Sequence, residues 1–246
     1  MRSETYCMDC MEALKDIPDK YFGMCIADHP YGLNITGRHR SKIVQVERER
    51  RAPIVGGSGR PFGGKGACLR GKPKSPCESA FYPVFDDSSP PDAEVFRELE
   101  RVSKKLIIWG GNFFLDKLGP ASCMIVWDKK RRGMSQADCE IAWTNCKGQS
   151  RIFEFRWNGM LQGDMKHKEK RIHATQKPVA LYKYLIENYA EPGDIILDPY
   201  LGSGSSRIAA YQLGYDFVGY EINETYFRLE EERFAEQTAQ LSFSDE

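Results

Sequence analysis

The chain has 246 residues, 41% of them hydrophobic, which is enough for one domain with a sizeable core, and no run approaches the roughly 20 apolar residues of a membrane span. Its 35 basic and 35 acidic side chains balance overall, but residues 36–80 hold 11 basic against three acidic residues. A second basic excess, 11 against six, lies at residues 127–172. Such stretches indicate either solvated loops or a polyanionic partner.

The N-terminal residues and the cysteines limit the class of protein further. The sequence MRSETYCMDC lacks the apolar stretch of a signal peptide, so a cytoplasmic protein is expected. Among eight cysteines only Cys7 and Cys10 form a close C-x-x-C pair. A structural zinc site usually needs two such pairs, or one pair with nearby histidines, so reduced thiols and no metal are expected.

The first third of the chain predicts a strand at residues 4–8, a short helix at 10–18 and a buried strand at 22–27 that stops at Asp28. Residues 34–88 follow, rich in Gly, Pro and Arg and without periodicity. They are predicted to form a basic, mobile insertion, because long segments of this composition are usually functional or disordered.

Regular structure resumes at Pro91. Apolar residues at helical spacing predict a helix over 91–105, led by acids and closed by lysines as the helix dipole prefers. A turn with a short helix is expected at 110–118. Further strands are predicted at residues 106–109, 123–127, 140–144, 151–157, 194–198 and 216–221, and further helices at 177–189, 205–214 and from a cap at Asn223 toward residue 240. Alternating strands and helices predict an α/β fold with a mostly parallel sheet.

The stretch ILDPYLGSGSS (196–206) is a glycine-rich turn between a strand and a helix, and the next strand ends at Glu221. This arrangement is typical of a nucleoside-binding crevice, in which the acid accepts hydrogen bonds from ribose hydroxyls. The turn lacks the third glycine of G-x-G-x-x-G, since Arg207 stands there, and Asp198 would repel a pyrophosphate. S-adenosylmethionine, which has an ammonium, a sulfonium and a ribose but no phosphate, suits the turn better than a dinucleotide.

Three motifs together resemble one family. DPYLGSGSS resembles the D-P-F-x-G-S-G-T cofactor turn of amino-group DNA methyltransferases, DHPYG (28–32) resembles their catalytic D-P-P-Y, and HATQKP (173–178) resembles their H-P-T-Q-K-P. The catalytic motif comes first and the cofactor motif last, as in the β-class. The resemblance implies one catalytic domain over 1–246 with a Rossmann-like methyltransferase fold: a mostly parallel, seven-stranded sheet, helices on both faces and a circularly permuted motif order.

The resemblance also implies the chemistry. A methyl group would pass from S-adenosylmethionine to an exocyclic amine of a base flipped out of duplex DNA. The Asp28 carboxylate and the backbone carbonyl of His29 would accept the two amine hydrogens, Pro30 would stiffen the turn and Tyr31 would stack on the base. His29 stands where proline is usual, and its side chain is a candidate to titrate near neutral pH and make activity pH-sensitive.

The same resemblance assigns the cofactor-binding residues. They are Asp198, Pro199, Tyr200, Gly202, Ser203, Gly204, Glu221, Asp9, Thr175, Gln176 and Lys177. For Asp9, a surface acid at a helix start is nearly as good an interpretation. Cytosine-specific members more often have serine where this chain has Asp28, which favours adenine N6 over cytosine N4.

Duplex DNA is the expected partner, held by residues 34–88 and by a target-recognition region at 128–172. No membrane contact is expected. A homodimer and a cognate restriction nuclease encoded elsewhere are left open, as is a bacterial host or phage origin. An RNA or protein amine methyltransferase and a non-catalytic DNA-binding protein are the alternatives.

Overall fold

The structure is a computed structural model that describes residues 1–32, 88–133, 137–158 and 161–242. The predicted insertion at 34–88 lies outside the described residues except for Ser88. The predicted recognition region at 128–172 is described apart from two short gaps. No helix in the described part of the chain is long and apolar enough to cross a membrane.

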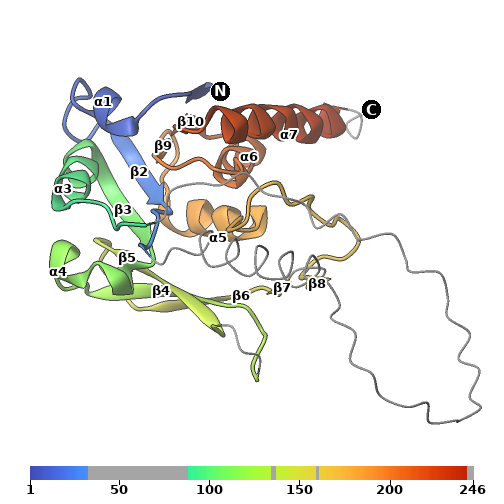
Figure 1. Ribbon diagram of the computed structural model, residues 1–246, viewed down its shortest axis with the longest axis horizontal. Helices are drawn as coiled ribbons and strands as arrows, with labels where there is room; N and C mark the ends of the chain where they lie inside the picture. The colour runs from blue at the N-terminus through green and yellow to red at the C-terminus, as the bar shows by residue number, and fades with distance from the viewer. Residues whose placement is uncertain (33–87, 134–136, 159–160, 243–246) are drawn as a thin grey trace, which may run out of the picture.

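The centre of the molecule is an eight-stranded sheet in the order β1-β10-β9-β2-β3-β5-β4-β6 (Figure 1). Its strands are β1 (Ser3–Tyr6), β2 (Phe22–Ala27), β3 (Ser103–Trp109), β4 (Cys123–Asp128), β5 (Cys139–Thr144), β6 (Arg151–Glu154), β9 (Ile195–Asp198) and β10 (Asp216–Tyr220). All of its pairings are parallel except those of β5, which runs antiparallel to both β3 and β4. The α/β fold with a mostly parallel sheet is confirmed. The strand count is eight, as the separate strand predictions had it, and not the seven that the family resemblance implied.

Six α-helices and one 3-10 helix are described besides the sheet. They are α1 (Cys10–Leu14), α3 (Ala93–Val102), the 3-10 helix η1 (Gly111–Phe113), α4 (Leu115–Leu118), α5 (Val179–Tyr189), α6 (Ser205–Leu213) and α7 (Glu224–Ser242). As predicted, Asn223 accepts hydrogen bonds at α7 from the backbone N–H groups of Thr225 (3.0 Å) and Tyr226 (3.2 Å).

Two element boundaries differ from the prediction. The helix predicted over 91–105 ends at Val102 because Ser103 is extended (φ −118°, ψ 141°), so Lys104 and Lys105 belong to β3 and do not close the helix. The strand predicted at 151–157 stops at Glu154, and Trp157 belongs to a separate two-stranded pair, β7 (Trp157–Asn158) with β8 (Leu161–Gln162).

Both faces of the sheet are buried, and alternation along the central strands divides the core in two. In β3, Ile107 and Trp109 face one cluster, whereas Leu106 and Ile108 face the other. The first cluster includes residues of α5 and α6, and the second includes residues of α1 and α3. Burial on both faces explains why β2 reads as a continuous apolar run.

The chain leaves β2 toward β3 and leaves β9 toward β10, in opposite directions from the β9–β2 pair. This is the topological switch point of the sheet, where ligands bind outside the carboxyl ends of parallel strands. Asp28 follows β2 and the turn at 199–204 follows β9. The topology alone therefore brings the two sequence motifs together.

The two glycines that flank α6 give a stability prediction. Gly204 (φ +70°) and Gly214 (φ +79°) are both left-handed, but a Cβ on Gly204 would lie 2.4 Å from Cγ of Glu230, whereas a Cβ on Gly214 meets nothing within 4 Å. Gly214→Ala should lower the free energy of unfolding by about 1–2 kcal/mol through backbone strain. Gly204→Ala should lower it by about 2–4 kcal/mol because overpacking adds to the strain. Urea unfolding followed by circular dichroism measures both, and equal losses would contradict the structure.

Candidate active site

A cavity of about 760 Å³ opens at the switch point, where its walls come from the residues that follow β2, β9 and β10. All four residues of the predicted catalytic tetrapeptide, Asp28, His29, Pro30 and Tyr31, line it. Seven of the eleven predicted cofactor residues also line it: Tyr200, Gly202, Ser203, Glu221, Thr175, Gln176 and Lys177. Asp9, Asp198, Pro199 and Gly204 are not part of its lining.

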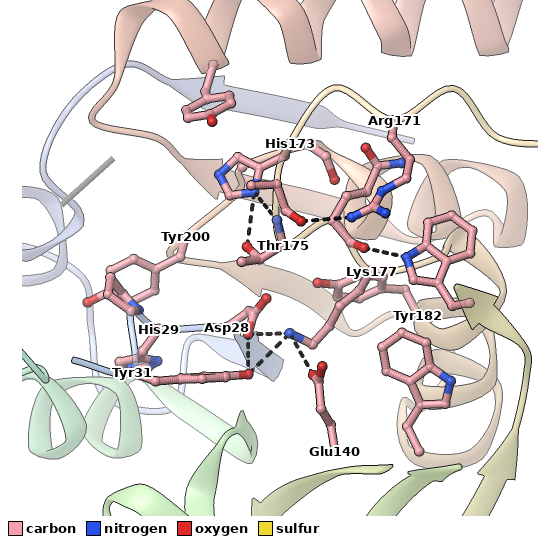
Figure 2. A pocket seen from close by; sticks show the side chains of 18 of the residues that line it. Asp28, His29, Tyr31, Glu140, Arg171, His173, Thr175, Lys177, Tyr182 and Tyr200 are labelled. Carbon is pink, nitrogen blue, oxygen red and sulfur yellow. Dashed lines mark hydrogen bonds and ion pairs between the residues drawn. The ribbon is translucent and has the colours of Figure 1, made fainter. Parts of the chain in front are cut away.

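Asp28 is held from one side (Figure 2). Its Oδ1 accepts a hydrogen bond from the Tyr31 hydroxyl (2.8 Å) and forms an ion pair with Nζ of Lys177. Lys177 also contacts the Tyr31 hydroxyl at 3.3 Å. Burial, and next the charge of Asp28, raise the pKa of Tyr31 well above its ordinary value, so the phenol stays protonated and donates.

Lys177 is only 4% exposed, and a second acid, Glu140, shares its charge. Oε2 of Glu140 lies 3.3 Å from Nζ of Lys177, and Oε1 forms an ion pair with Lys129. Burial alone would lower the pKa of Lys177, but the charges of Asp28 and Glu140 outweigh it and raise that pKa. Burial would likewise raise the pKa of Glu140, but Lys177 and Lys129 lower it to about 2. The ammonium of Lys177 is therefore within ion-pair distance of two carboxylates, those of Asp28 and Glu140.

Glu140 and Lys129 were not predicted as site residues. Glu140 lies near the beginning of β5, opposite Trp127 at the end of β4. Because β5 is antiparallel to its neighbours, its first residues lie at the same edge as the carboxyl ends of the parallel strands. The sequence showed a strand at 140–144 but carried no signal of its direction.

The side chain of His29 is buried in an aromatic cluster. It is 3% exposed, stacks on Phe96 (ring centroids 4.9 Å apart) and packs against Tyr200 (4.5 Å). Neither ring nitrogen has a hydrogen-bond partner among the described residues. Burial lowers the pKa of His29 to about 3. The expectation that His29 titrates near neutral pH is therefore wrong, since a charged imidazole could not be solvated there.

Asp198 is buried and accepts two hydrogen bonds that hold the glycine-rich turn in place. It is 2% exposed; its Oδ1 accepts a hydrogen bond from the backbone N–H of Tyr200 (3.0 Å), and its Oδ2 accepts one from the Ser206 hydroxyl. Burial raises its pKa to about 7. Gly204 is covered by Glu230, which pairs with the buried Arg207. The structure thus gives Asp198 and Gly204 roles in shaping the turn, and Arg207 a place in the core.

Glu221, which follows β10, also lines the cavity. Its Oε2 accepts a hydrogen bond from the N–H of Gly202 (2.9 Å), and its Oε1 accepts one from the N–H of Asn223 (2.8 Å). Burial raises its pKa. Each carboxylate oxygen keeps a further lone pair for a ligand hydroxyl. Gly202, at φ +52° and without a side chain, leaves the backbone open to a ligand beside this acid.

Three further predicted cofactor residues are Thr175, Gln176 and Asp9. Two of them line the cavity, and Asp9 does not. The hydroxyl of Thr175 lies 3.1 Å from Nδ1 of His173, and both residues line the cavity. Gln176 accepts a hydrogen bond from the N–H of Ile172 (2.9 Å) and so ties the loop together. Asp9 caps α1 by accepting a hydrogen bond from the N–H of Met11 (2.9 Å), which is the surface-acid interpretation of that residue.

A basic and aromatic wall of the cavity comes from the segment predicted as the target-recognition region. Its members are Lys129, Arg131, Trp157 and Arg171, with Trp127 beside them. The Arg171 guanidinium lies over the Trp157 ring at 5.8 Å, and the Lys129 ammonium lies over Trp127 at 4.6 Å. Composition indicated this segment, but not which of its side chains reach the cavity.

The burial of His29 predicts a pH-dependent stability. Its ordinary pKa of 6.5 falls to about 3 in the folded chain, so below pH 6.5 the unfolded chain binds a proton that the folded chain does not. The free energy of unfolding should therefore decrease as the pH is lowered, and His29 should account for about 2 kcal/mol of that decrease at pH 5. His29→Phe, which keeps an aromatic ring among Phe96 and Tyr200, should remove that part of the loss. Urea unfolding of both proteins at pH 7 and pH 5 measures it, and an equal loss in both would refute the assignment to His29.

Comparison with known proteins is consistent with this geometry. Residues 126–232 match the N6_N4_Mtase family, described as "DNA methylase". The methylase homologue YubD of Escherichia coli K12 is 43% identical over 70 residues, which are 28% of this chain and 31% of YubD. The DNA adenine methyltransferase YhdJ of the same organism is 46% identical over 57 residues, 23% of this chain and 19% of YhdJ. The matched segments therefore span less than a third of these relatives.

The fold has a counterpart among solved structures. TTHA0409 of Thermus thermophilus, a candidate DNA modification methylase solved in complex with S-adenosyl-L-methionine, superimposes with a TM-score of 0.55 at 17% identity. The superposition covers 96% of this chain and 94% of that one. The family match, which covers less than half of the chain, the sequence relatives and the fold all show similarity to DNA methylases.

Proposed function

We propose that the chain transfers a methyl group from S-adenosylmethionine to the N6 amine of adenine in duplex DNA. One observation carries the proposal: Asp28 and Tyr31 share a single cavity with Glu221 and the glycine-rich turn. One carboxylate could accept hydrogens from an amine and the other could bind a ribose, so the cavity can take both a methyl donor and its acceptor.

The described residues fit the cofactor. Glu221 offers acceptors for ribose hydroxyls, and Gly202 offers open backbone. When bound, S-adenosylmethionine supplies a methyl group on a sulfonium, which is the electrophile. We assign cofactor contact to five of the seven cavity-lining members of the predicted set, Tyr200, Gly202, Ser203, Thr175 and Glu221. The other two, Gln176 and Lys177, are assigned to the support of the loop and of Asp28. Asp198, Pro199 and Gly204 are assigned to the support of the turn.

The residues after β2 would activate the amine. The lone pair of an exocyclic amine is delocalised into the base, so a site that accepts hydrogen bonds from both N–H groups favours the nucleophilic geometry as charge develops. Asp28 would accept one hydrogen and the backbone carbonyl of His29 the other. The Tyr31 ring already stacks on Phe113, with centroids 5.4 Å apart, and would extend that stack to the flipped base.

Adenine is favoured over cytosine by Asp28, which stands where cytosine-specific members more often have serine. YhdJ, by name an adenine methyltransferase, supports the same choice. Cytosine N4 is the second candidate, because the matched family includes both bases by name. RNA and protein amines use the same chemistry and differ only in the partner held beside the cavity.

We propose that DNA is held by the basic wall of the cavity within residues 128–172 and by the insertion at 34–88. Lys129, Arg131 and Arg171 supply positive charge at the cavity itself. Phosphate contacts of this kind would make affinity fall with salt concentration. A homodimer and a cognate nuclease remain open as further partners.

The deciding experiment is product identification. The protein is incubated with methyl-labelled S-adenosylmethionine and unmethylated duplex DNA or RNA, the nucleic acid is digested, and nucleosides are identified by mass spectrometry. N6-methyladenine from DNA is the expected product. N4-methylcytosine would overturn the base assignment, and a product from RNA alone would overturn the substrate. Cofactor binding without any methylated nucleoside would overturn the nucleic-acid activity.

Asp28→Ala tests the amine pocket. It should lower the turnover rate by about 100- to 1000-fold, the usual loss of one preorganised group at a developing charge. Binding of S-adenosylmethionine, measured by calorimetry, should persist. Asp116→Ala, the same change at an exposed acid of α4, is the matched control and should leave turnover unchanged. Full turnover in the Asp28 variant would refute the assignment.

Glu221→Gln tests the cofactor end. Loss of a charged hydrogen bond to a ribose hydroxyl should weaken S-adenosylmethionine binding about tenfold or more. Isothermal titration calorimetry measures the dissociation constant. Glu224→Gln, three residues further on and exposed, should bind as the wild type does. Unchanged affinity in the Glu221 variant would remove Glu221 from the cofactor site.

A further inference from the structure

The two oxygens of Asp28, the carboxylate proposed to activate the amine, have different surroundings. Both described contacts to Asp28 from side chains, the Tyr31 hydroxyl and the Lys177 ammonium, are to Oδ1. Among the described residues, Oδ2 accepts no hydrogen bond, and Asp28 lines the cavity. Figure 2 shows the Lys177 ammonium in contact with both Asp28 and Glu140. One oxygen is thus fixed by the protein, and the other is available to a ligand.

Two positive side chains lie close together, and Glu140 pairs with both of them. Lys177 and Lys129 are two nearly buried ammonium groups, 4% and 7% exposed, and Glu140 lies between them. Without the charge of Glu140, Lys129 would lose its ion-pair partner. Lys177 would then pair with Asp28 alone, because a buried charge keeps its nearest counter-ion. A carboxylate neutralised in this way is a weaker acceptor for an amine hydrogen.

We propose that Glu140 is a positioning residue for methyl transfer: by sharing the Lys177 ammonium it leaves Oδ2 of Asp28 free and sufficiently negative to accept a hydrogen from the target amine. Glu140 itself touches neither the amine nor the cofactor in this assignment. The inference rests on the proposed function, since it concerns the same reaction at the same cavity. It also explains why an acid at the beginning of an antiparallel strand faces the catalytic turn.

The test compares three variants under saturating S-adenosylmethionine and unmethylated duplex DNA. Glu140→Gln keeps the shape and removes the charge, and kcat should fall about 10- to 100-fold, as for a displaced reacting group. Glu140→Asp restores the charge on a shorter stem and should recover part of that loss. Glu100→Gln, the same change at an exposed acid of α3 that does not line the cavity, should match the wild type. The dissociation constant of S-adenosylmethionine should change less than about twofold in all three.

A second measurement needs no substrate. Asp28→Asn and Glu140→Gln each leave Lys177 with one carboxylate, whereas the double variant leaves it with none. The loss of unfolding free energy in the double variant should therefore exceed the sum of the single losses. Additive losses would overturn the shared-lysine arrangement.

The outcomes separate the two ideas. A selective fall in kcat with Glu140→Gln, partial recovery with Glu140→Asp and coupled unfolding would support the inference. Wild-type kcat in Glu140→Gln would overturn it, as would a fall accompanied by equal losses of cofactor affinity and folded protein, which would make Glu140 purely structural. A wild-type protein that methylates no nucleic acid would refute the proposed function instead, and the unfolding measurement would still judge the lysine arrangement.

Discussion

The buried ammonium of Lys177 is the constraint on which the site depends. A lone charge at this depth would be strongly unfavourable, and two carboxylates lie against it. One of them follows β2 and the other begins β5, while Lys177 itself precedes α5. Satisfying one side chain therefore fixes three distant segments of the chain relative to one another. The cavity is bounded by those same segments.

Sheet topology delivers the segments, and short-range hydrogen bonds refine them. The switch point between β9 and β2 brings the two motif-bearing turns to one edge. Asp198 and Glu221 then shape the turn between them, the first through the Tyr200 N–H and the second through the Gly202 N–H. Both acids have raised pKa values because they are buried, so the geometry of the turn is maintained by carboxyl groups that the fold has partly removed from water. Rigid support of this kind allows a binding site to be preorganised.

The sequence predicted the parts of this arrangement that are local. Apolar runs and alternation located every strand of the sheet, and glycine spacing with a terminal acid located the crevice around Gly202 and Glu221. Strand direction is not local: β5 reads the same in either orientation, so Glu140 could not be predicted to lie at the site. The direction of a side chain is not local either. The sequence therefore could not show that the imidazole of His29, which was expected to titrate, packs against Phe96 and Tyr200. The roles of Asp28, Tyr31 and Glu221 in catalysis and binding stay predictions.

The position of β2 in the sheet also has a consequence for how the protein is made. The strand pairs with β3 on one side and with β9, which is encoded far downstream, on the other. Until the ribosome has added β9, one edge of β2 has no neighbour to receive its backbone hydrogen bonds. The strand that presents Asp28 is completed only when β9 has been synthesised. The cavity at the end of β2 thus cannot be complete before β9 is synthesised. A chain terminated before β9 would expose an apolar edge suited to aggregation and to proteolytic clearance.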